Sequence, residues 1–104
     1  MTERMNTSNV EFQQDERFHA ASASVAWTAT SGSKEIACRV SRELLAGYYG
    51  AGREPDQLIA AFRTHREVFE GIAREKIRCG EVESDRSGLF ARVVTADYFQ
   101  QLFV

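Results

Sequence analysis

The stretch from Pro55 to Gly80 constrains the fold most, because its apolar side chains recur every three or four residues. An α-helix turns once every 3.6 residues, so this spacing places those side chains along one side of a helix. Pro55 suits the first helical position, and Gly80 suits the residue just past the end. The sequence therefore predicts one long amphipathic helix. The positions that share its inward side are Leu58, Phe62, His65, Phe69, Ile72 and Lys76.

The opposite side of this helix is charged. Three opposite-charge pairs lie four residues apart: Arg63–Glu67, Arg66–Glu70 and Glu70–Arg74. Each pair of this kind stabilises a helix by roughly 0.2–0.5 kcal/mol. We expect solvent to surround this side, so that Glu70→Ala changes the stability very little. The acidic residues also interrupt any basic stripe of the kind that binds phosphate backbones.

Two runs of alternating apolar and polar residues flank a short turn that contains Gly32. Alternation with a period of two is typical of a strand with one buried face, and two such runs around a glycine turn indicate a β-hairpin. The apolar positions of the two runs are Val25, Trp27, Ala29, Ile36, Cys38 and Val40.

The remaining segments give shorter patterns. Leu89–Val93 alternates in the same way and predicts a third main strand. Val10–Phe12 suits a short edge strand, Gln13–Ser24 is expected to be an ordered loop, and Glu81–Gly88 a charged turn.

Two short helices complete the predicted elements. Ser41 is a suitable N-cap for a helix that ends near Gly50. Thr95 is a suitable cap for a final helix. The inward side chains of that final helix are Phe99, Leu102 and Phe103.

Because strands and helices fall in separate parts of the chain, the sequence predicts an α+β fold. We expect a small, mainly antiparallel sheet, made of the hairpin and the C-terminal strand, with the long helix and a shorter helix on one face. The residues that face the helices are then Trp27, Ile36, Cys38, Val40, Leu89 and Val93. The other face would be an open, mixed apolar and cationic surface that carries Thr28, Thr30, Ala37, Arg39, Phe90 and Arg92.

Composition narrows the class of protein. The 104 residues suffice for one domain, which we expect over residues 10–104 behind a disordered tail over residues 1–9. Two cysteines are too few for a secreted disulfide scaffold. The sequence lacks the apolar run of a membrane span and the pattern of a signal peptide, so we expect a cytoplasmic protein.

The cysteines and histidines are isolated in the sequence. They lack the C-x-x-C and H-x-x-x-H spacings of metal sites, so we expect no metal and no cofactor. His65 has two interpretations: one member of a nucleophile–base pair with Cys38 or a carboxylate, or a partly buried imidazole bonded to a backbone carbonyl or to Ser41. The sequence offers no identifiable third group to orient such a base, which favours the structural interpretation.

Two segments resemble a known family. Ile36–Ser41 contains an I-x-C-x-V-S strand end, and Phe62–Ala73 contains an H-R pair within a long helix. Together with a closing T-x-x-[DY] segment at Thr95–Tyr98, they are similar to the bacterial proteins grouped as domain of unknown function family 1488. The resemblance covers roughly residues 10–99.

The resemblance implies an α+β fold and a bacterial, proteobacterial, cytosolic protein, and it carries over no activity. It singles out Cys38, Ser41, His65 and Arg66 as positions within the family's pattern. These four residues are either a functional cluster or a buried group that holds the long helix to the hairpin. The chain departs from the family's pattern mainly over Gln13–Ser24.

We therefore expect a small non-enzymatic interaction or regulatory module with a protein partner. The candidate surface comprises Arg39, Phe90 and Arg92. A nucleic-acid-associated regulator is the alternative, because cations beside an aromatic ring can hold single strands, although the net charge of −2 disfavours it. A homodimer is a further alternative, no membrane partner is expected, and an enzyme that uses a thiol with His65 is less favoured.

Overall fold

The computed structural model describes residues 9–97, so most of the predicted tail and of the final helix lies outside the described residues. Residues 95–97 are helical, while Phe99, Leu102 and Phe103 are not described. The elements are β1 (Val10–Phe12), β2 (Arg17–His19), the 3-10 helix η2 (Ala20–Ser22), β3 (Ser24–Ser31), β4 (Lys34–Ser41), α1 (Arg42–Tyr48), α2 (Pro55–Thr64), α3 (Arg66–Arg78), β5 (Glu83–Asp85) and β6 (Gly88–Val93).

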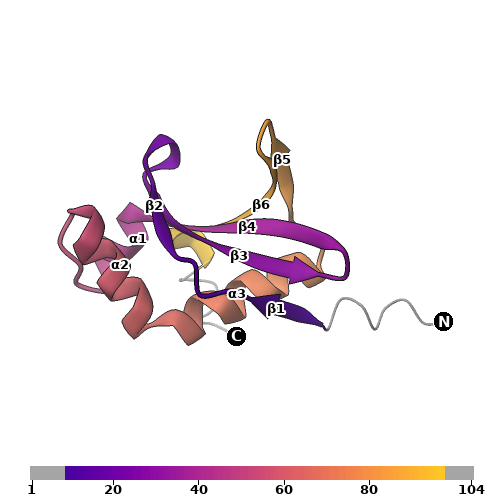
Figure 1. Ribbon diagram of the computed structural model, residues 1–104. Helices are drawn as coiled ribbons and strands as arrows, with labels where there is room; N and C mark the ends of the chain where they lie inside the picture. The colour runs from indigo at the N-terminus through magenta and orange to yellow at the C-terminus, as the bar shows by residue number, and fades with distance from the viewer. Residues whose placement is uncertain (1–8, 98–104) are drawn as a thin grey trace.

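One six-stranded sheet forms the centre of the molecule, in the order β1-β3-β4-β6-β5 with β2 also paired to β3. Figure 1 shows α3 running under one face of this sheet, while the β2 and β5 segments rise on the opposite side. The predicted α+β fold is therefore confirmed. Among the described residues, none of the helices is long and apolar enough to cross a membrane.

The predicted hairpin is confirmed in full. β3 and β4 pair antiparallel from Ser24–Ser41 at one end to Ser31–Lys34 at the turn. Gly32 takes a φ of 64° there, a conformation that costs glycine little. β6 pairs with β4 in parallel, because the three helices carry the chain back to the other end of the sheet. The other strand pairs are antiparallel.

Two short strands lie where the sequence predicted irregular structure. The expected loop over Gln13–Ser24 contains β2 and η2, and the expected turn over Glu81–Gly88 contains β5. Each strand has three residues, and β5 is exposed along its whole length. Such strands are too short to show a period of two, and their pairing with longer neighbours determines them. The predicted strand Val10–Phe12 is confirmed by its pairing with β3.

The predicted long helix is divided into α2 and α3 at His65, which adopts φ −114° and ψ 25°. The Thr64 hydroxyl donates to the Ala60 carbonyl oxygen at 3.1 Å, a contact that competes with helix hydrogen bonds and often bends helices. The His65 amide is shared between the carbonyls of Ala61 and Phe62, each at 3.2 Å. The two helices therefore meet at an angle, as Figure 1 shows.

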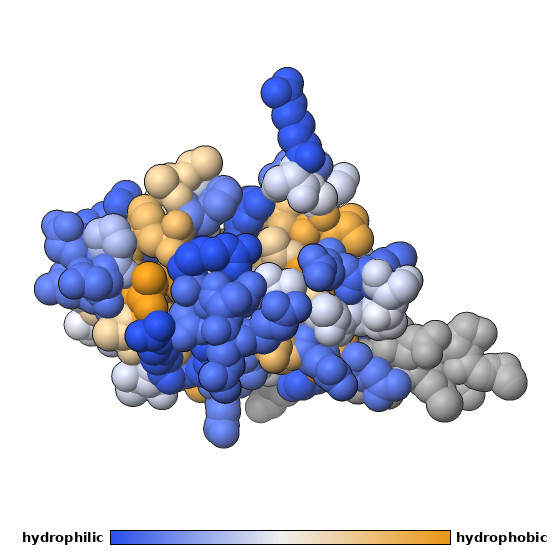
Figure 2. All heavy atoms as spheres, in the orientation of Figure 1, coloured by the Kyte–Doolittle hydropathy of each residue, from blue (hydrophilic) through white to orange (hydrophobic). Residues whose placement is uncertain are grey.

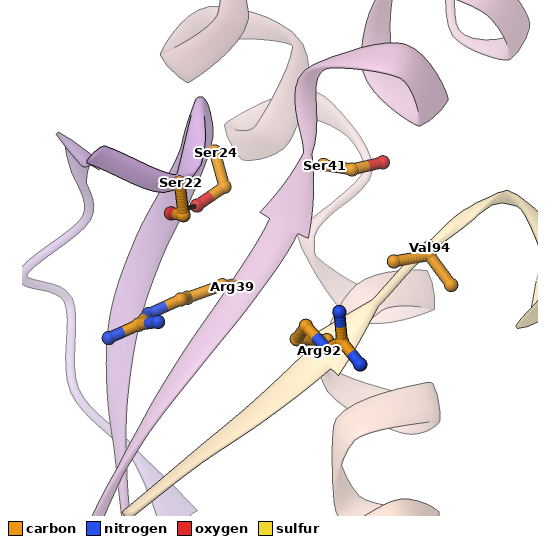
Figure 3. A pocket seen from close by; sticks show the side chains of 6 residues that line it. All are labelled: Ser22, Ser24, Arg39, Ser41, Arg92 and Val94. Carbon is orange, nitrogen blue, oxygen red and sulfur yellow. Dashed lines mark hydrogen bonds between the residues drawn. The ribbon is translucent and has the colours of Figure 1, made fainter. Parts of the chain in front are cut away.

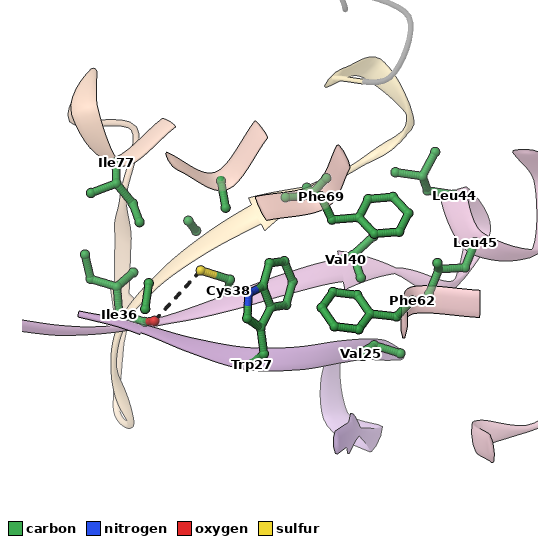
Figure 4. Packing of buried hydrophobic residues seen from close by; sticks show 14 of the residues in the cluster. Val25, Trp27, Ile36, Cys38, Val40, Leu44, Leu45, Phe62, Phe69 and Ile77 are labelled. Atoms are coloured by element: carbon green, nitrogen blue, oxygen red, sulfur yellow. Dashed lines mark hydrogen bonds between the residues drawn. The ribbon is translucent and has the colours of Figure 1, made fainter. Parts of the chain in front are cut away.

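The core lies between the sheet and these helices (Figure 4). Phe62 packs against Trp27 with ring centroids 4.6 Å apart, and it stacks on Phe69 at 5.8 Å. Of the six positions predicted to face the helices, five are buried and Leu89 is partly buried against the same cluster. The alternation of the predicted strands therefore identified the sheet side of the core correctly. Of the predicted inward helix positions, Leu58, Phe62 and Phe69 are buried, while His65, Ile72 and Lys76 are partly buried.

The charged side of the helices differs from the prediction, because the N-terminal segment crosses it. Arg63 Nε donates to Glu16 at 2.6 Å instead of meeting its predicted partner Glu67. Arg66 forms ion pairs with both Glu16 and Glu70, and its Nη1 lies 2.9 Å from Oε2 of Glu70. The Glu16 side chain is only 7% exposed, so this side is partly an interface within the molecule.

Candidate functional site

A hollow of about 350 Å³ lies on the sheet face opposite α3. Figure 1 places this face between the raised β2–η2 segment and the β5 hairpin. Six residues line the hollow, and we call it the sheet-face hollow (Figure 3): Ser22, Ser24, Arg39, Ser41, Arg92 and Val94.

Strand alternation brings these side chains together. Cys38 and Val40 of β4 face the core, so Arg39 and Ser41 face the other side. In the neighbouring strands, Ser24 pairs with Ser41 and Arg92 pairs with Arg39. Three strands therefore supply two guanidinium groups and two hydroxyl groups to one area of the sheet.

Arg39 is more buried than the sequence predicted. The residue is 8% exposed, and its guanidinium lies over the Phe90 ring at 4.2 Å. Arg39 Nη2 donates to an Asp85 carboxylate oxygen at 3.4 Å. Its Nε is buried, and within residues 9–97 it has no hydrogen-bond partner. The expectation of a fully open cation is wrong for this residue, because β5 folds over it.

Arg92 is the accessible cation of the hollow. Its side chain is 58% exposed, and its Nε donates to a Glu83 carboxylate oxygen at 2.8 Å. The Arg92 carbonyl accepts a hydrogen bond from Lys76 Nζ at 2.6 Å, which fixes this part of β6 to α3. The sequence identified Arg39, Phe90 and Arg92 as neighbours, but it missed the carboxylates of β5 beside them.

One of those carboxylates, Asp85, is held in its charged form. Hydrogen bonds from the Ser87 side chain and amide, followed by the contact with Arg39, lower the pKa of Asp85. Ser87 Oγ donates to Asp85 at 2.7 Å, so the turn between β5 and β6 fixes this carboxylate. At neutral pH Arg39 therefore faces an ionised carboxylate on β5.

On the side of the hollow across from Arg92, the side chains of His19, Ser22 and Ser24 hydrogen-bond in series, and we call this series the hydroxyl chain. The sequence did not predict it. His19 Nδ1 lies 2.6 Å from Ser22 Oγ, and Ser22 Oγ forms a short hydrogen bond with Ser24 Oγ. Ala23 between the two serines has a left-handed conformation, with φ 51° and ψ 55°. Its carbonyl accepts from the Arg42 amide at 3.0 Å, so backbone hydrogen bonds hold this unfavourable conformation in place.

Ser41 has two roles that are compatible. Its Oγ accepts a hydrogen bond from the Leu44 amide at 3.1 Å, which confirms the predicted N-cap of α1. That bond uses only an oxygen lone pair, so the hydroxyl hydrogen remains available as a donor.

The four residues that the family pattern singled out have separate partners. The Cys38 thiol lies 3.9 Å from the Ile36 carbonyl within the core, and Ser41 caps α1. The His65 ring packs on Tyr49 with centroids 4.7 Å apart, and Arg66 binds the carboxylates described above. This placement favours structural roles for three of them, while Ser41 also lines the hollow.

Both thiols are poor nucleophiles at neutral pH. Burial raises the pKa of Cys38 to about 12. The Cys79 thiol lies 3.5 Å from a Glu75 carboxylate, and this contact raises its pKa as well. A thiol–His mechanism needs a thiolate, which these environments disfavour. In the part of the chain that the structure describes, there is also no group of three or more His, Cys, Asp or Glu residues placed to hold a metal ion.

Comparisons with known proteins agree with the fold. A family model described as "Protein of unknown function (DUF1488)" matches residues 10–87, which include Ser22, Ser24, Arg39 and Ser41 but end before Arg92. A crystal structure at 1.60 Å of a protein of unknown function from the DUF1488 family of Shewanella loihica PV-4 is similar, with a TM-score of 0.70. That protein is 18% identical, and the match covers 81% of this chain and 90% of the other. No curated protein matches this chain.

Proposed function

This chain belongs to the DUF1488 family of proteins of unknown function, and we propose from its own geometry that it is a small non-enzymatic binding module. In this proposal the sheet-face hollow receives an acidic group that a partner protein carries.

The chemistry of the lining carries this proposal. Two guanidinium groups and three hydroxyl groups line the hollow, and none of its six lining residues is acidic. Arg39 Nε is a buried donor without a partner among the described residues, and leaving such a donor unsatisfied costs about 1–3 kcal/mol. This Nε is shielded from solvent, so a ligand acceptor reaches it only when the side chains around it move, and that contact would recover part of the cost.

The open shape of the hollow favours a protein partner over a small molecule. Pockets for small molecules enclose most of their ligand, whereas this hollow is open to solvent on one side. On the side of the molecule drawn in Figure 2, apolar residues form small separate areas among hydrophilic ones. Docking through a charged group suits such a surface.

We place this module in the cytoplasm. Cys38 and Cys79 are both free thiols, and Cys79 is exposed. An exposed free thiol suits a reducing compartment. The partner we propose is therefore a cytoplasmic protein with an acidic segment.

Binding of an acidic group requires competition with β5. Glu83 and Asp85 already contact Arg92 and Arg39, so an incoming anion must displace them. Glu83→Gln removes the competing charge while it keeps the size of the side chain. We therefore expect this variant to bind acidic peptides more tightly than the natural chain does.

A labelled poly-glutamate peptide tests the proposal by fluorescence anisotropy at low salt. We expect saturable binding that Arg92→Gln weakens by about tenfold and that Glu83→Gln strengthens. Lys34→Gln is the matched control, because it removes one positive charge at the far end of β4. Absence of binding, or equal losses in Arg92→Gln and Lys34→Gln, would contradict the proposed site.

A further inference from the structure

We infer that the acidic group is a phosphate monoester on a phosphorylated side chain of the partner protein, rather than a carboxylate. This inference rests on the proposed function above, and it specifies the chemistry of the ligand in the same hollow.

The first argument is charge. Arg39 and Arg92 each face one carboxylate of β5, so two negative charges balance them in the absence of a ligand. A single carboxylate supplies one negative charge, and it leaves one arginine without a partner when β5 is displaced. A phosphate monoester carries a charge of about −1.5 to −2 near pH 7, so one group replaces both carboxylates.

The second argument is the placement of the donors on both sides of the hollow. Figure 3 shows Ser22, Ser24 and Arg39 on one side of the hollow, with Ser41 and Arg92 on the other. A planar carboxylate has two oxygens and is satisfied by the fork of one arginine. The three terminal oxygens of a phosphate point in different directions, so they accept hydrogen bonds from both sides at once.

The third argument is the hydroxyl chain. When His19 Nδ1 carries the proton, it donates to Ser22, Ser22 donates to Ser24, and the Ser24 hydroxyl hydrogen is left for a ligand. Ser24 is 3% exposed, so a ligand oxygen that reaches it enters a largely desolvated position. A hydrogen bond to a charged acceptor is strongest in such a position.

The test uses three labelled peptides that differ at one position, which is phosphoserine, glutamate or serine. We expect the phosphoserine peptide to bind at least about tenfold more tightly than the glutamate peptide, with no measurable binding of the serine peptide. Ser24→Ala should weaken binding of the phosphoserine peptide severalfold and leave the glutamate peptide nearly unchanged. Arg92→Gln should abolish the preference, and Lys34→Gln should preserve it.

The outcomes separate the two proposals. Equal affinity for the phosphoserine and glutamate peptides would overturn the phosphate inference and leave the proposed function standing. Failure of both peptides to bind would overturn both proposals.

Two further probes identify the source of the phosphate. Inorganic phosphate that competes at the concentration at which the peptide binds would indicate a small phosphorylated molecule and overturn the protein partner. Tighter binding of a single-stranded oligonucleotide than of the phosphoserine peptide would indicate nucleic acid and also overturn it. We expect both to compete only weakly, because neither presents a monoester on a peptide backbone.

Discussion

The two faces of the sheet use the same strands for different purposes. On the face that α2 and α3 cover, β4 contributes Cys38 and Val40 to a fully buried apolar core. On the opposite face the same strand contributes Arg39 and Ser41 to a polar hollow. Burying a guanidinium with an unpartnered Nε is unfavourable, and the apolar face supplies the stability that keeps it in place. The comparison suggests that one face maintains the fold and the other is available for binding.

The largest expected effect lies on the helix-covered face. Phe62 is fully buried between Trp27 and Phe69, so Phe62→Ala should lower the free energy of unfolding by roughly 3–5 kcal/mol. Urea denaturation followed by tryptophan fluorescence measures this loss. A midpoint equal to that of the natural chain would contradict this account, because the helix-covered face would then contribute no more to the stability than the opposite face.

The next effect concerns Glu16, which lies between β1 and β2 and forms ion pairs with Arg63 of α2 and Arg66 of α3. The hydrogen bond from Arg63, together with Arg66, lowers the pKa of Glu16 from 4.5 to about 2. A lowered pKa means that the stabilisation is complete above about pH 4.5 and is lost as the pH falls toward 2. A shift of this size corresponds to roughly 3 kcal/mol, and solvent screening at the exposed Arg63 reduces that contribution. Glu16→Gln should lack this steep acid dependence, and denaturation curves at several pH values measure it. The same acid profile in the variant would rule out Glu16 as its source.

A smaller effect corrects the prediction for Glu70. Its side chain and that of Arg66 are each 19% exposed, so their ion pair is only partly solvated. Glu70→Ala should therefore cost about 1 kcal/mol rather than nothing, while Arg66 keeps its contact with Glu16. Glu75→Ala, at an exposed position with a pair to Arg78, is the control expected to be nearly silent. Equal stability of the two variants would support the original expectation that solvent surrounds the charged side of the helices.

The smallest effect on stability is expected in the hollow. Arg92 is 58% exposed and its pair with Glu83 is solvated, so Arg92→Gln should change the free energy of unfolding by less than about 0.5 kcal/mol. The same variant should bind the acidic peptide about tenfold more weakly, which sharpens the comparison between the faces. A loss of stability as large as that of Phe62→Ala would show that Arg92 maintains the fold instead.

The sequence predicted those parts of the fold that repeat a pattern over several turns or pairs. The hairpin around Gly32, the cap at Ser41 and the apolar side of the helices all follow from local periodicity or local hydrogen bonding. The break at His65 does not, because the hydroxyl of Thr64 competes with the helix hydrogen bonds at one point only. The spacing of the apolar residues does not reveal such a contact.

The candidate site was predictable in part for the same reason. Arg39, Phe90 and Arg92 share a face by strand alternation, and this was visible in the sequence. Their carboxylate partners and the hydroxyl chain come from β5, β2 and η2, whose short segments have no periodic signal. The sequence also gives no sign that Ala23, between Ser22 and Ser24, has a left-handed conformation, since alanine has no preference for that conformation.

The measurement that tests the central claim most directly is a two-dimensional NMR titration of the 15N-labelled chain with the phosphoserine peptide. The proposal predicts saturable shifts confined to the amides around Ser22, Ser24, Arg39, Ser41 and Arg92, together with the Nε–H signals of the two arginines. Shifts confined to α2 and α3, or no shifts at millimolar peptide, would contradict the assignment of the sheet-face hollow as the binding site.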